Sequence, residues 1–208
     1  QLGGKITKQL TIINGVAAEL PAARLAELRQ SPSVRWVSLD APVLKTDCPT
    51  CVNTTNLQNT YNQTIHADKV WNEAPYLQGQ GIGVAVGDSG IKRSHADFTN
   101  RVVGKTQTNI IPDPQDGFGH GSFVAGIIGG SGTAGQGAYI GVAPKTKLID
   151  VRVTTADGIS TESDVVAGLQ WVYENRTTYN IRVVNLSLNA SGAQSYQTSP
   201  LDAACEVL

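Results

Sequence analysis

GVAVGDSG, residues 83–90, is an apolar run that changes at Asp88 to an acid and small residues. Such a run predicts a buried strand that ends near Asp88. Two more apolar runs, KLIDVRV at 147–153 and IRVVNLSLN at 181–189, predict strands of the same kind. Helical patterns alternate with these strands, which favours an α/β fold with a doubly wound, mostly parallel sheet. In such sheets functional side chains gather beyond the carboxyl ends of the strands, where Asp88 lies.

Three segments around these strands have helical patterns. HADKVWNEA at 66–74 and HGSFVAGIIGG at 120–130 predict helices, the second despite its glycines. STESDVVAGLQWVYENR at 160–176 has the clearest pattern, because apolar residues recur at helical spacing along it. Thr161 followed by Asp164 suits a capping box at its start.

The first 43 residues form a separate pattern. KITKQLTIING at 5–15 predicts a strand, ELPAARLAELRQ at 19–30 a helix, and VRWVSLD at 34–40 another strand. This order is half of a ferredoxin-like α+β unit, too little to close a core by itself. The following stretch is rich in Thr, Asn and Gln and predicts an exposed linker or loop. The expected segments are therefore 1–43, 44–65 and 66–208.

Composition excludes several classes of partner. The chain has 208 residues, a formal net charge of -1 and no cluster of Lys and Arg, so we expect no nucleic-acid partner. No apolar stretch approaches the length of a membrane span, so we expect no membrane partner. Cys48 and Cys51 form a C-x-x-C pair and Cys205 stands alone. Redox activity, zinc binding and a disulfide all remain open for the pair, with a local disulfide or cysteines outside this sequence favoured.

Asp88 and His120 are the residues most suited to chemistry. A carboxylate that follows an apolar strand is partly desolvated, so its charge needs a partner. His120 opens a helix of small residues, where the macrodipole disfavours the imidazolium and a nearby carboxylate favours it. Together they suit a general base and two thirds of a nucleophilic triad. The alternative is structural, with Asp88 capping its own turn and His120 capping the helix. We expect His66 and His95 to be structural or surface residues.

Other enzyme classes lack their motifs. GQGIG at 79–83 precedes its strand, whereas a dinucleotide fingerprint must follow one. GGSGTAGQG at 129–137 lacks the Lys of a phosphate loop. Neither a G-x-S-x-G elbow nor an H-E-x-x-H zinc motif occurs in the chain.

Longer stretches resemble the subtilases, the subtilisin-like serine proteases. VAVGDSGIKRSHADF at 84–98 resembles their aspartate motif, and DGFGHGSFVAGIIGG at 116–130 resembles their histidine motif. The Asp and His stand 32 residues apart, as in subtilisin. Residues 141–172 are similar to the next strand, rim loop and helix of the family, and RVVNLSLNASG at 182–192 to the segment that pairs with substrate. Residues 11–43 are similar to the second half of the inhibitor-like propeptide.

The resemblance implies a serine endopeptidase that acts on polypeptides. Asp88 would orient His120, which would take a proton from a serine and return it to the leaving amine. The family's Gly-Thr-Ser-x-Ala motif does not occur by Leu208, so we expect the serine in sequence that follows and an inactive fragment here. The substrate-binding residues implied are Ser187, Leu188 and Asn189 on one rim of the cleft and Gly158, Ile159 and Ser160 on the other.

The chain departs from the family pattern at several positions. Ser122 and Phe123 stand where Thr and His are usual, and Asn189 replaces a common glycine. Asp97 matches a position that ligates calcium in many members of the family. However, residues 129–141 lack carboxylates, which disfavours a calcium site, and no other cofactor is implied.

Further expectations follow from the resemblance alone. We expect a secreted zymogen whose own propeptide docks on the catalytic domain and is cut off within residues 43–65. The remainder of the catalytic domain would be a second intramolecular partner. The alternative from another class is a catalytically dead homologue or a module that binds and inhibits a protease.

Overall fold

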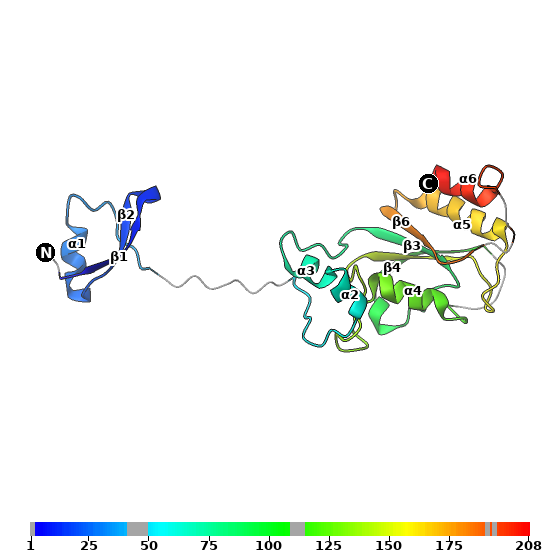
Figure 1. Cartoon of the computed structure of the whole chain (residues 1–208), viewed down its shortest axis with the longest axis horizontal. Coiled ribbons are helices and arrows are strands. Elements are labelled where there is room, and N and C mark those ends of the chain that lie inside the picture. Colours follow the sequence, from blue (N-terminus) through cyan, green and yellow to red (C-terminus); the bar gives the residue numbers. More distant parts are fainter. Residues whose placement is uncertain (1–2, 41–49, 109–114, 190–191, 193–194) are drawn as a thin grey trace. The chain divides into compact units, whose positions relative to one another are not determined.

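The computed structural model describes residues 3–40, 50–108, 115–189, 192 and 195–208. The chain divides into two compact units, Gln1–Asp47 and Cys48–Leu208 (Figure 1). The smaller unit is an antiparallel hairpin with short helical turns. The larger unit carries the predicted sheet.

A parallel four-stranded sheet forms the centre of the larger unit. Its strands are β3 (Gly83–Asp88), β4 (Val102–Gln107), β5 (Lys147–Arg152) and β6 (Ile181–Leu186). They lie in the order β4-β5-β3-β6, and every pair is parallel. The predicted strands β3, β5 and β6 are therefore confirmed, and β4 was missed. Asp88 ends the inner strand β3, with the ends of β5 and β6 on either side of it.

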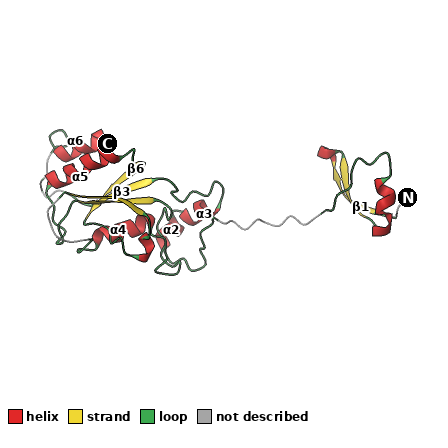
Figure 2. Ribbon diagram, turned by 180° about the vertical axis from the view of Figure 1, so that it is seen from behind, coloured by secondary structure: helices red, strands yellow, loops and turns green. Residues whose placement is uncertain are grey.

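Helices cover both faces of this sheet, as the sequence predicts (Figures 1 and 2). α4 (His120–Gly129) lies on one face, and α5 (Glu162–Asn175) and α6 (Pro200–Val207) lie on the other. Strand β3 is buried along its whole length and alternates between two cores. Ala85 packs with the α5 face, whereas Val86 packs with the α4 face.

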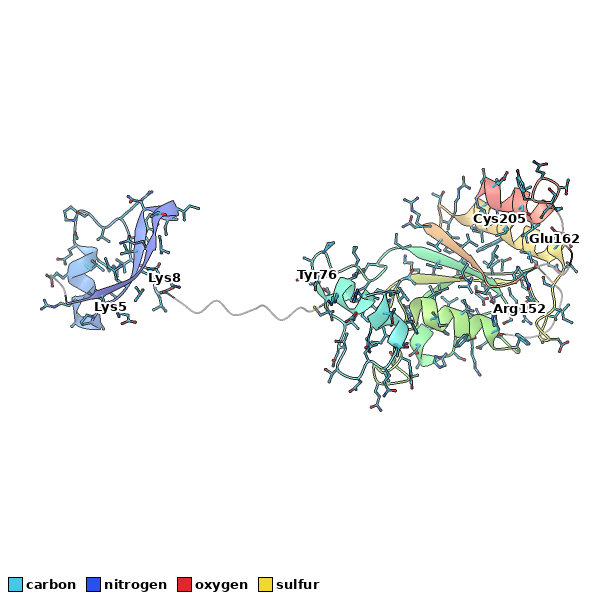
Figure 3. The ribbon with its side chains drawn as sticks, viewed as in Figure 1. Lys5, Lys8, Tyr76, Arg152, Glu162 and Cys205 are labelled. Atoms are coloured by element: carbon cyan, nitrogen blue, oxygen red, sulfur yellow. The ribbon has the colours of Figure 1, made fainter. Side chains whose placement is uncertain are left out.

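Side chains fix the ends of the helices on the α5 face. The Thr161 hydroxyl accepts a hydrogen bond from the Asp164 amide, so Thr161 is the N-cap that the predicted capping box requires. The Asp164 carboxylate accepts from the Thr161 hydroxyl. Glu162, at the start of α5, accepts a hydrogen bond from the Leu201 amide of α6 at 3.3 Å (Figure 3). Ser199 caps α6 by accepting from the Asp202 amide. These bonds join α6 to α5 beside the sheet.

Residues 50–65, predicted as an exposed linker or loop, are not a linker between units, although most of them are exposed. This stretch belongs to the larger unit and contains α2 (Thr60–Thr64), which is followed by α3 (Ala67–Asn72). Asn59 and Asn62 are buried, and their amide groups bond the backbone of Ile140 at 2.9 and 2.7 Å. The polar composition therefore reflects amide side chains that satisfy buried backbone groups. Residues 41–49 lie outside the described residues.

The smaller unit differs from its predicted order. β1 (Lys5–Leu10) and β2 (Gly15–Glu19) pair antiparallel around η1 (Thr11–Ile13), so the strand predicted at 5–15 ends at Leu10, and a second strand that was not predicted follows the turn. Asn14 adopts the left-handed conformation that lets the chain reverse. The helix of this unit is shorter than predicted, η2 (Ala22–Arg24) and α1 (Leu25–Arg29).

The strand predicted at 34–40 is wrong, because these residues form no ladder with another strand. None of the described residues of this unit is fully buried. Lys5 and Lys8 lie along β1, and both are exposed (Figure 3). The unit is thus a hairpin with a short helix, and a ferredoxin-like layer is not shown.

Candidate active site

Asp88 and His120 meet at the carboxyl edge of the sheet. His120 Nδ1 lies 2.9 Å from both carboxylate oxygens of Asp88. The Asp88 residue is 4% exposed, whereas the His120 side chain is 42% exposed. In the neutral ring this contact favours a proton on Nδ1, because Nδ1 faces an acceptor, and leaves Nε2 with its lone pair. The pair is thus a partly exposed base oriented by a buried carboxylate.

The backbone around Asp88 and His120 has almost no spare room. Gly121, the second residue of α4, lies against the turn that follows β3. A Cβ at Gly121 would lie 2.2 Å from the carbonyl oxygen of Gly90 and 3.1 Å from Cβ of Asp88. Only glycine permits this approach, which brings the start of α4 against Asp88. Gly121 therefore serves close packing at the start of α4.

Asp116 is a further charged residue at this edge, and the sequence alone assigned it no role. Its carboxylate accepts hydrogen bonds from Ser89 Oγ, Gly119 N, Ser122 N and Ser122 Oγ. Burial raises the pKa of Asp116, but the hydrogen bonds from Ser122, Gly119 and Ser89 outweigh it and hold the pKa below the usual value. The only sequence signal was its place at the head of the histidine motif.

The two predicted rims lie on either side of Asp88. Gly158, Ile159 and Ser160 follow β5, and Ser187, Leu188 and Asn189 follow β6. Strand β3 lies between β5 and β6, so both rims start at the sheet edge that carries Asp88. Ala190 and Ser191, which belong to the segment at 182–192 that resembles the substrate-pairing segment of the family, lie outside the described residues.

Phe118 connects one rim to the histidine. Its ring centroid lies 6.4 Å from that of His120. A Cβ at Gly158 would lie 2.8 to 3.0 Å from three atoms of the Phe118 ring, so the ring edge covers this glycine. On the same rim, Ile159 is exposed and Ser160 Oγ bonds the Val153 carbonyl at 2.7 Å.

The other rim is anchored through its own side chains. Leu188 packs against the core on the α5 face. Asn185 Nδ2 donates to Ser187 Oγ at 2.9 Å. Ser187 and Asn189 are exposed, so this rim has free surface beside the sheet edge.

Asp150 on β5 is a second buried carboxylate near this edge. Desolvation by burial raises its pKa to about 7, and nearby Asp116 adds to the rise. The Ile91 amide and the charges of Arg93 and Arg152 oppose it. Asp150 is therefore close to half-protonated at neutral pH, in contrast to Asp116.

The residues around Asp97 do not fit a carboxylate-rich calcium site. Asp97 Oδ1 accepts the Ala134 amide at 2.8 Å, and the loop of residues 129–141 brings no acidic side chain to it. Across the described residues, no group of three or more His, Cys, Asp or Glu side chains is placed to hold a metal ion. A hard cation prefers several carboxylate and carbonyl oxygens, and here one carboxylate oxygen already binds an amide.

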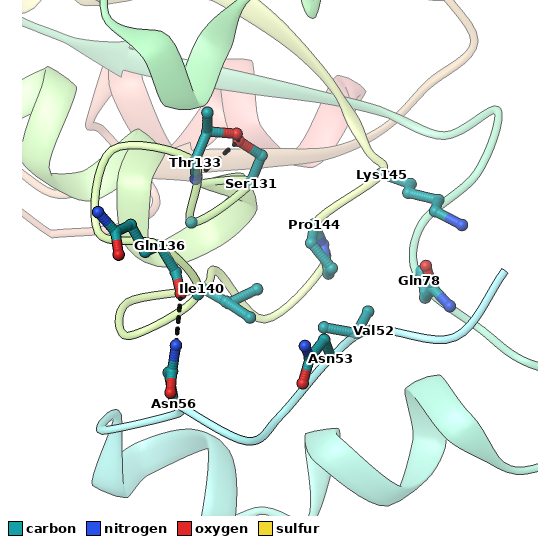
Figure 4. Close-up of a pocket in the computed structure, with 12 residues that line it drawn as sticks. Val52, Asn53, Asn56, Gln78, Ser131, Thr133, Gln136, Ile140, Pro144 and Lys145 are labelled. Carbon is teal, nitrogen blue, oxygen red and sulfur yellow. Dashed lines mark hydrogen bonds between the residues drawn. The ribbon is translucent and has the colours of Figure 1, made fainter. Parts of the chain in front are cut away.

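A separate pocket of about 510 Å³ lies by the same loop (Figure 4). Its lining includes Asn56, Gln78, Gln136 and Lys145 and contains no predicted site residue. Asn56 Nδ2 donates to the Gln136 carbonyl at 3.1 Å across it.

The remaining histidines and cysteines lie outside the Asp88–His120 pair. His95 Nδ1 accepts the Asp97 amide and caps the turn η3 (Ala96–Phe98), and His66 precedes α3. Cys51 is disulfide-bonded, so its sulfur is not available as a zinc ligand in this state, and Cys205 is free. Cys48 lies outside the described residues. Within the described parts of the chain, no helix has the length and apolar character needed to cross a bilayer.

Comparison of the chain with known proteins identifies its family. The Subtilase family profile matches residues 79–207. An extracellular serine proteinase from Thermus sp. (strain Rt41A) is 34% identical over 204 residues, which cover 97% of this chain and 47% of that protein. Subtilisin E from Bacillus subtilis (strain 168) is 31% identical over 202 residues, covering 94% of this chain and 48% of that protein.

A solved structure agrees with these matches. The crystal structure of a cold adapted subtilisin-like serine proteinase superposes with a TM-score of 0.51 at 33% identity, over 63% of this chain and 43% of that chain. The chain thus spans about half the length of the curated relatives it matches. It has the α/β subtilisin-like sheet and the sequence of the family, and it belongs to the subtilases.

Proposed function

We propose that the intact protein is a serine endopeptidase of the subtilisin type. The observation that carries the proposal is the contact of His120 Nδ1 with both oxygens of the buried Asp88 at 2.9 Å. This geometry leaves Nε2 to accept a proton, which a nucleophilic serine needs. The serine would lie in sequence that follows Leu208, so residues 1–208 alone would be inactive.

His120 and Asp88 each have a defined role in the proposed reaction. His120 Nε2 takes the serine proton while the serine oxygen attacks the scissile carbonyl carbon. The same proton then passes to the leaving amine as the C–N bond breaks, which leaves an acyl-enzyme. In the second half water attacks the ester carbonyl and loses a proton to His120. The bond between the acyl carbon and the serine oxygen then breaks, and His120 returns the proton to the serine. The Asp88 carboxylate orients the His120 ring and stabilises the imidazolium in both halves.

The substrate is proposed to be a polypeptide in extended conformation. It would lie between Gly158–Ser160 and Ser187–Asn189, with affinity from main-chain hydrogen bonds. The position of both rims at the ends of the strands that flank β3 supports this. Such binding favours broad side-chain preference.

Residues 1–43 are proposed to be part of an inhibitor-like propeptide. The match to the Thermus proteinase covers 97% of this chain, whereas the family profile begins at residue 79, so the similarity includes the smaller unit. Buried Asn59 and Asn62 argue that the cut lies before residue 59, since a protease needs accessible backbone. Amino-terminal sequencing of the mature protein tests this, and a start after residue 59 would refute it.

Secretion is a further part of the proposal. The Thermus relative is named as extracellular, and a propeptide-controlled protease suits that location. The disulfide at Cys51 is also typical of oxidising compartments. Protease activity in the culture medium, absent from the washed cells, is the expected result.

A serine-directed fluorophosphonate probe tests the enzyme proposal in the intact protein. We expect labelling near neutral pH in the wild type and a loss of about 1,000-fold or more in the labelling rate in His120→Ala. Phe98→Leu, a core change away from the pair, serves as the matched control. No labelling of the folded wild type would support the alternative, a dead homologue or an inhibitory module.

A further inference from the structure

The Asp116 carboxylate accepts hydrogen bonds from residues next to Asp88 and from residues next to His120. Oδ1 accepts from Ser89 Oγ and Gly119 N, each at 2.8 Å. Oδ2 accepts from Ser122 N at 2.9 Å and Ser122 Oγ at 2.5 Å. Ser89 follows Asp88 directly, whereas Gly119 and Ser122 flank His120. One carboxylate therefore connects the end of β3 to the start of α4.

The hydroxyl of Ser89 passes this connection on to the backbone of α4. Because Ser89 Oγ donates its proton to Asp116, its lone pairs are free to accept, and Gly121 N donates to it at 2.9 Å. Ser89 is 1% exposed, so water does not compete for this hydroxyl. Its amide donates to Asp88 Oδ1 at 2.7 Å. The chain Asp116–Ser89–Gly121 thus holds the residue after His120 at a fixed distance from Asp88.

Helix capping alone does not account for this arrangement. Bonds to Gly119 N and Ser122 N would satisfy free amides at the start of α4 in any protein. The bond to Ser89 satisfies no amide of α4 directly. It fixes a hydroxyl in the turn after β3, and that hydroxyl in turn accepts from Gly121 N. Lys92 N also donates to Ser122 Oγ at 2.8 Å. Because Ser122 Oγ donates to Asp116, this bond is a second connection between Asp116 and the segment that follows β3.

We propose that Asp116 is a positioning residue for the proposed proteolytic reaction, which holds the His120 ring on Asp88 through Ser89 and Ser122. The inference rests on the proposed function for its catalytic consequence, but the ring geometry exists in this chain and can be measured without activity. A carboxylate is required because all four partners donate to it. An asparagine would offer one NH₂ group where an acceptor is needed.

The first test is ¹⁵N NMR of the histidine side chains in the 208-residue chain. The chain has three histidines, so His120 can be assigned by substitution. Asp116→Asn should move the His120 ring nitrogens toward the values of Asp88→Asn. Asp164→Asn is the matched control, because Asp164 also bonds a helix start but lies away from the pair. Unchanged His120 nitrogens in a folded Asp116→Asn protein would overturn the inference.

The second test measures peptide-anilide hydrolysis by the intact protein per fluorophosphonate-labelled site. Asp116→Asn should lower kcat about 10- to 100-fold with KM within about twofold, because a misplaced base affects the transition state more than binding. Ser89→Ala keeps the three bonds of Asp116 to α4 and should show the same split. The double variant should be no worse than the poorer single one.

The outcomes separate this inference from the proposed function. A lower thermal midpoint with unchanged kcat per labelled site would make Asp116 a helix cap only and refute the inference. If the folded wild type is not labelled at all, the proposed function fails, and the NMR comparison decides the role of Asp116. Should Asp116→Asn fail to fold, Ser89→Ala decides it with the same two readouts.

Discussion

The two units of the chain bury their apolar side chains to very different degrees. In the larger unit, strands β3 and β5 are buried on both faces, and the side chain of Ile149 is fully inaccessible. In the smaller unit Ile12 is 95% exposed and Leu39 87% exposed. Apolar patterns occur in both, so pattern alone does not produce a core. The larger unit has helices for both faces of its sheet, whereas one hairpin and a short helix cannot cover each other.

This difference explains where a precise site can form. Positioning a base against a carboxylate requires neighbours that are themselves fixed by packing. At the edge of β3, Gly121 lies against Gly90, and Asp116 has four hydrogen-bond donors. The smaller unit offers no buried polar network of this kind among its described residues. The predictions below test the contrast.

Core truncation should give the largest effect. Ile149→Ala should lower the free energy of unfolding of the larger unit by about 4 kcal/mol, through lost burial and a cavity. Urea unfolding followed by tryptophan fluorescence measures it, with Trp71 and Trp171 reporting on the larger unit and Trp36 on the smaller unit. Ile12→Ala is the matched control in the smaller unit and should change stability by less than about 0.5 kcal/mol. Similar costs for both would remove the contrast between the units.

Asp150 should make the larger unit less stable as pH rises. Its pKa of about 7 in the folded state lies above the ordinary 3.8, so the folded protein binds this proton more tightly than the unfolded chain. Stability should therefore fall between about pH 4 and pH 7, on the order of 3 kcal/mol. Asp150→Asn should remove this slope in urea titrations at each pH. Parallel pH curves for the two proteins would contradict it.

A methyl group at Gly121 should disturb the site edge. Gly121→Ala should cost about 2 kcal/mol, because the clash at Gly90 is with backbone on both sides. Gly126→Ala is the control in the same helix, where a Cβ meets nothing within 4 Å. It should gain up to about 1 kcal/mol from better helix propensity. Thermal unfolding of both variants measures the difference, and equal midpoints would show that the close approach is relaxed in solution.

The smallest effect is expected at the cap of α5. Thr161→Ala removes the hydroxyl that accepts from the Asp164 amide and should cost about 1 kcal/mol. Thr99→Ala, where an exposed hydroxyl bonds Ala96 in a short turn, should cost less. Denaturant midpoints of the two variants check this order. A cost at Thr99 equal to that at Thr161 would mean that the cap adds nothing to α5.

Much of the larger unit could be predicted from its sequence, because strong local patterns there agree with the final packing. Strands β3, β5 and β6 and the Asp88–His120 spacing are of this kind. β4, VVGKTQ, was missed because its mixed composition has no strand period, and only pairing with β5 defines it. The strand predicted at 34–40 had the pattern but no partner strand. Asp116 could not be found, since its role depends on the close approach of the 88–90 turn to α4.

The tautomer of His120 tests the central claim most directly. In ¹⁵N-labelled protein, long-range ¹H–¹⁵N spectra show which ring nitrogen carries the proton at neutral pH. Contact with Asp88 predicts protonation at Nδ1 in the wild type and a change toward Nε2 in Asp88→Asn, whose amide can donate to Nδ1. The same tautomer in both proteins would contradict the pairing of Asp88 with His120.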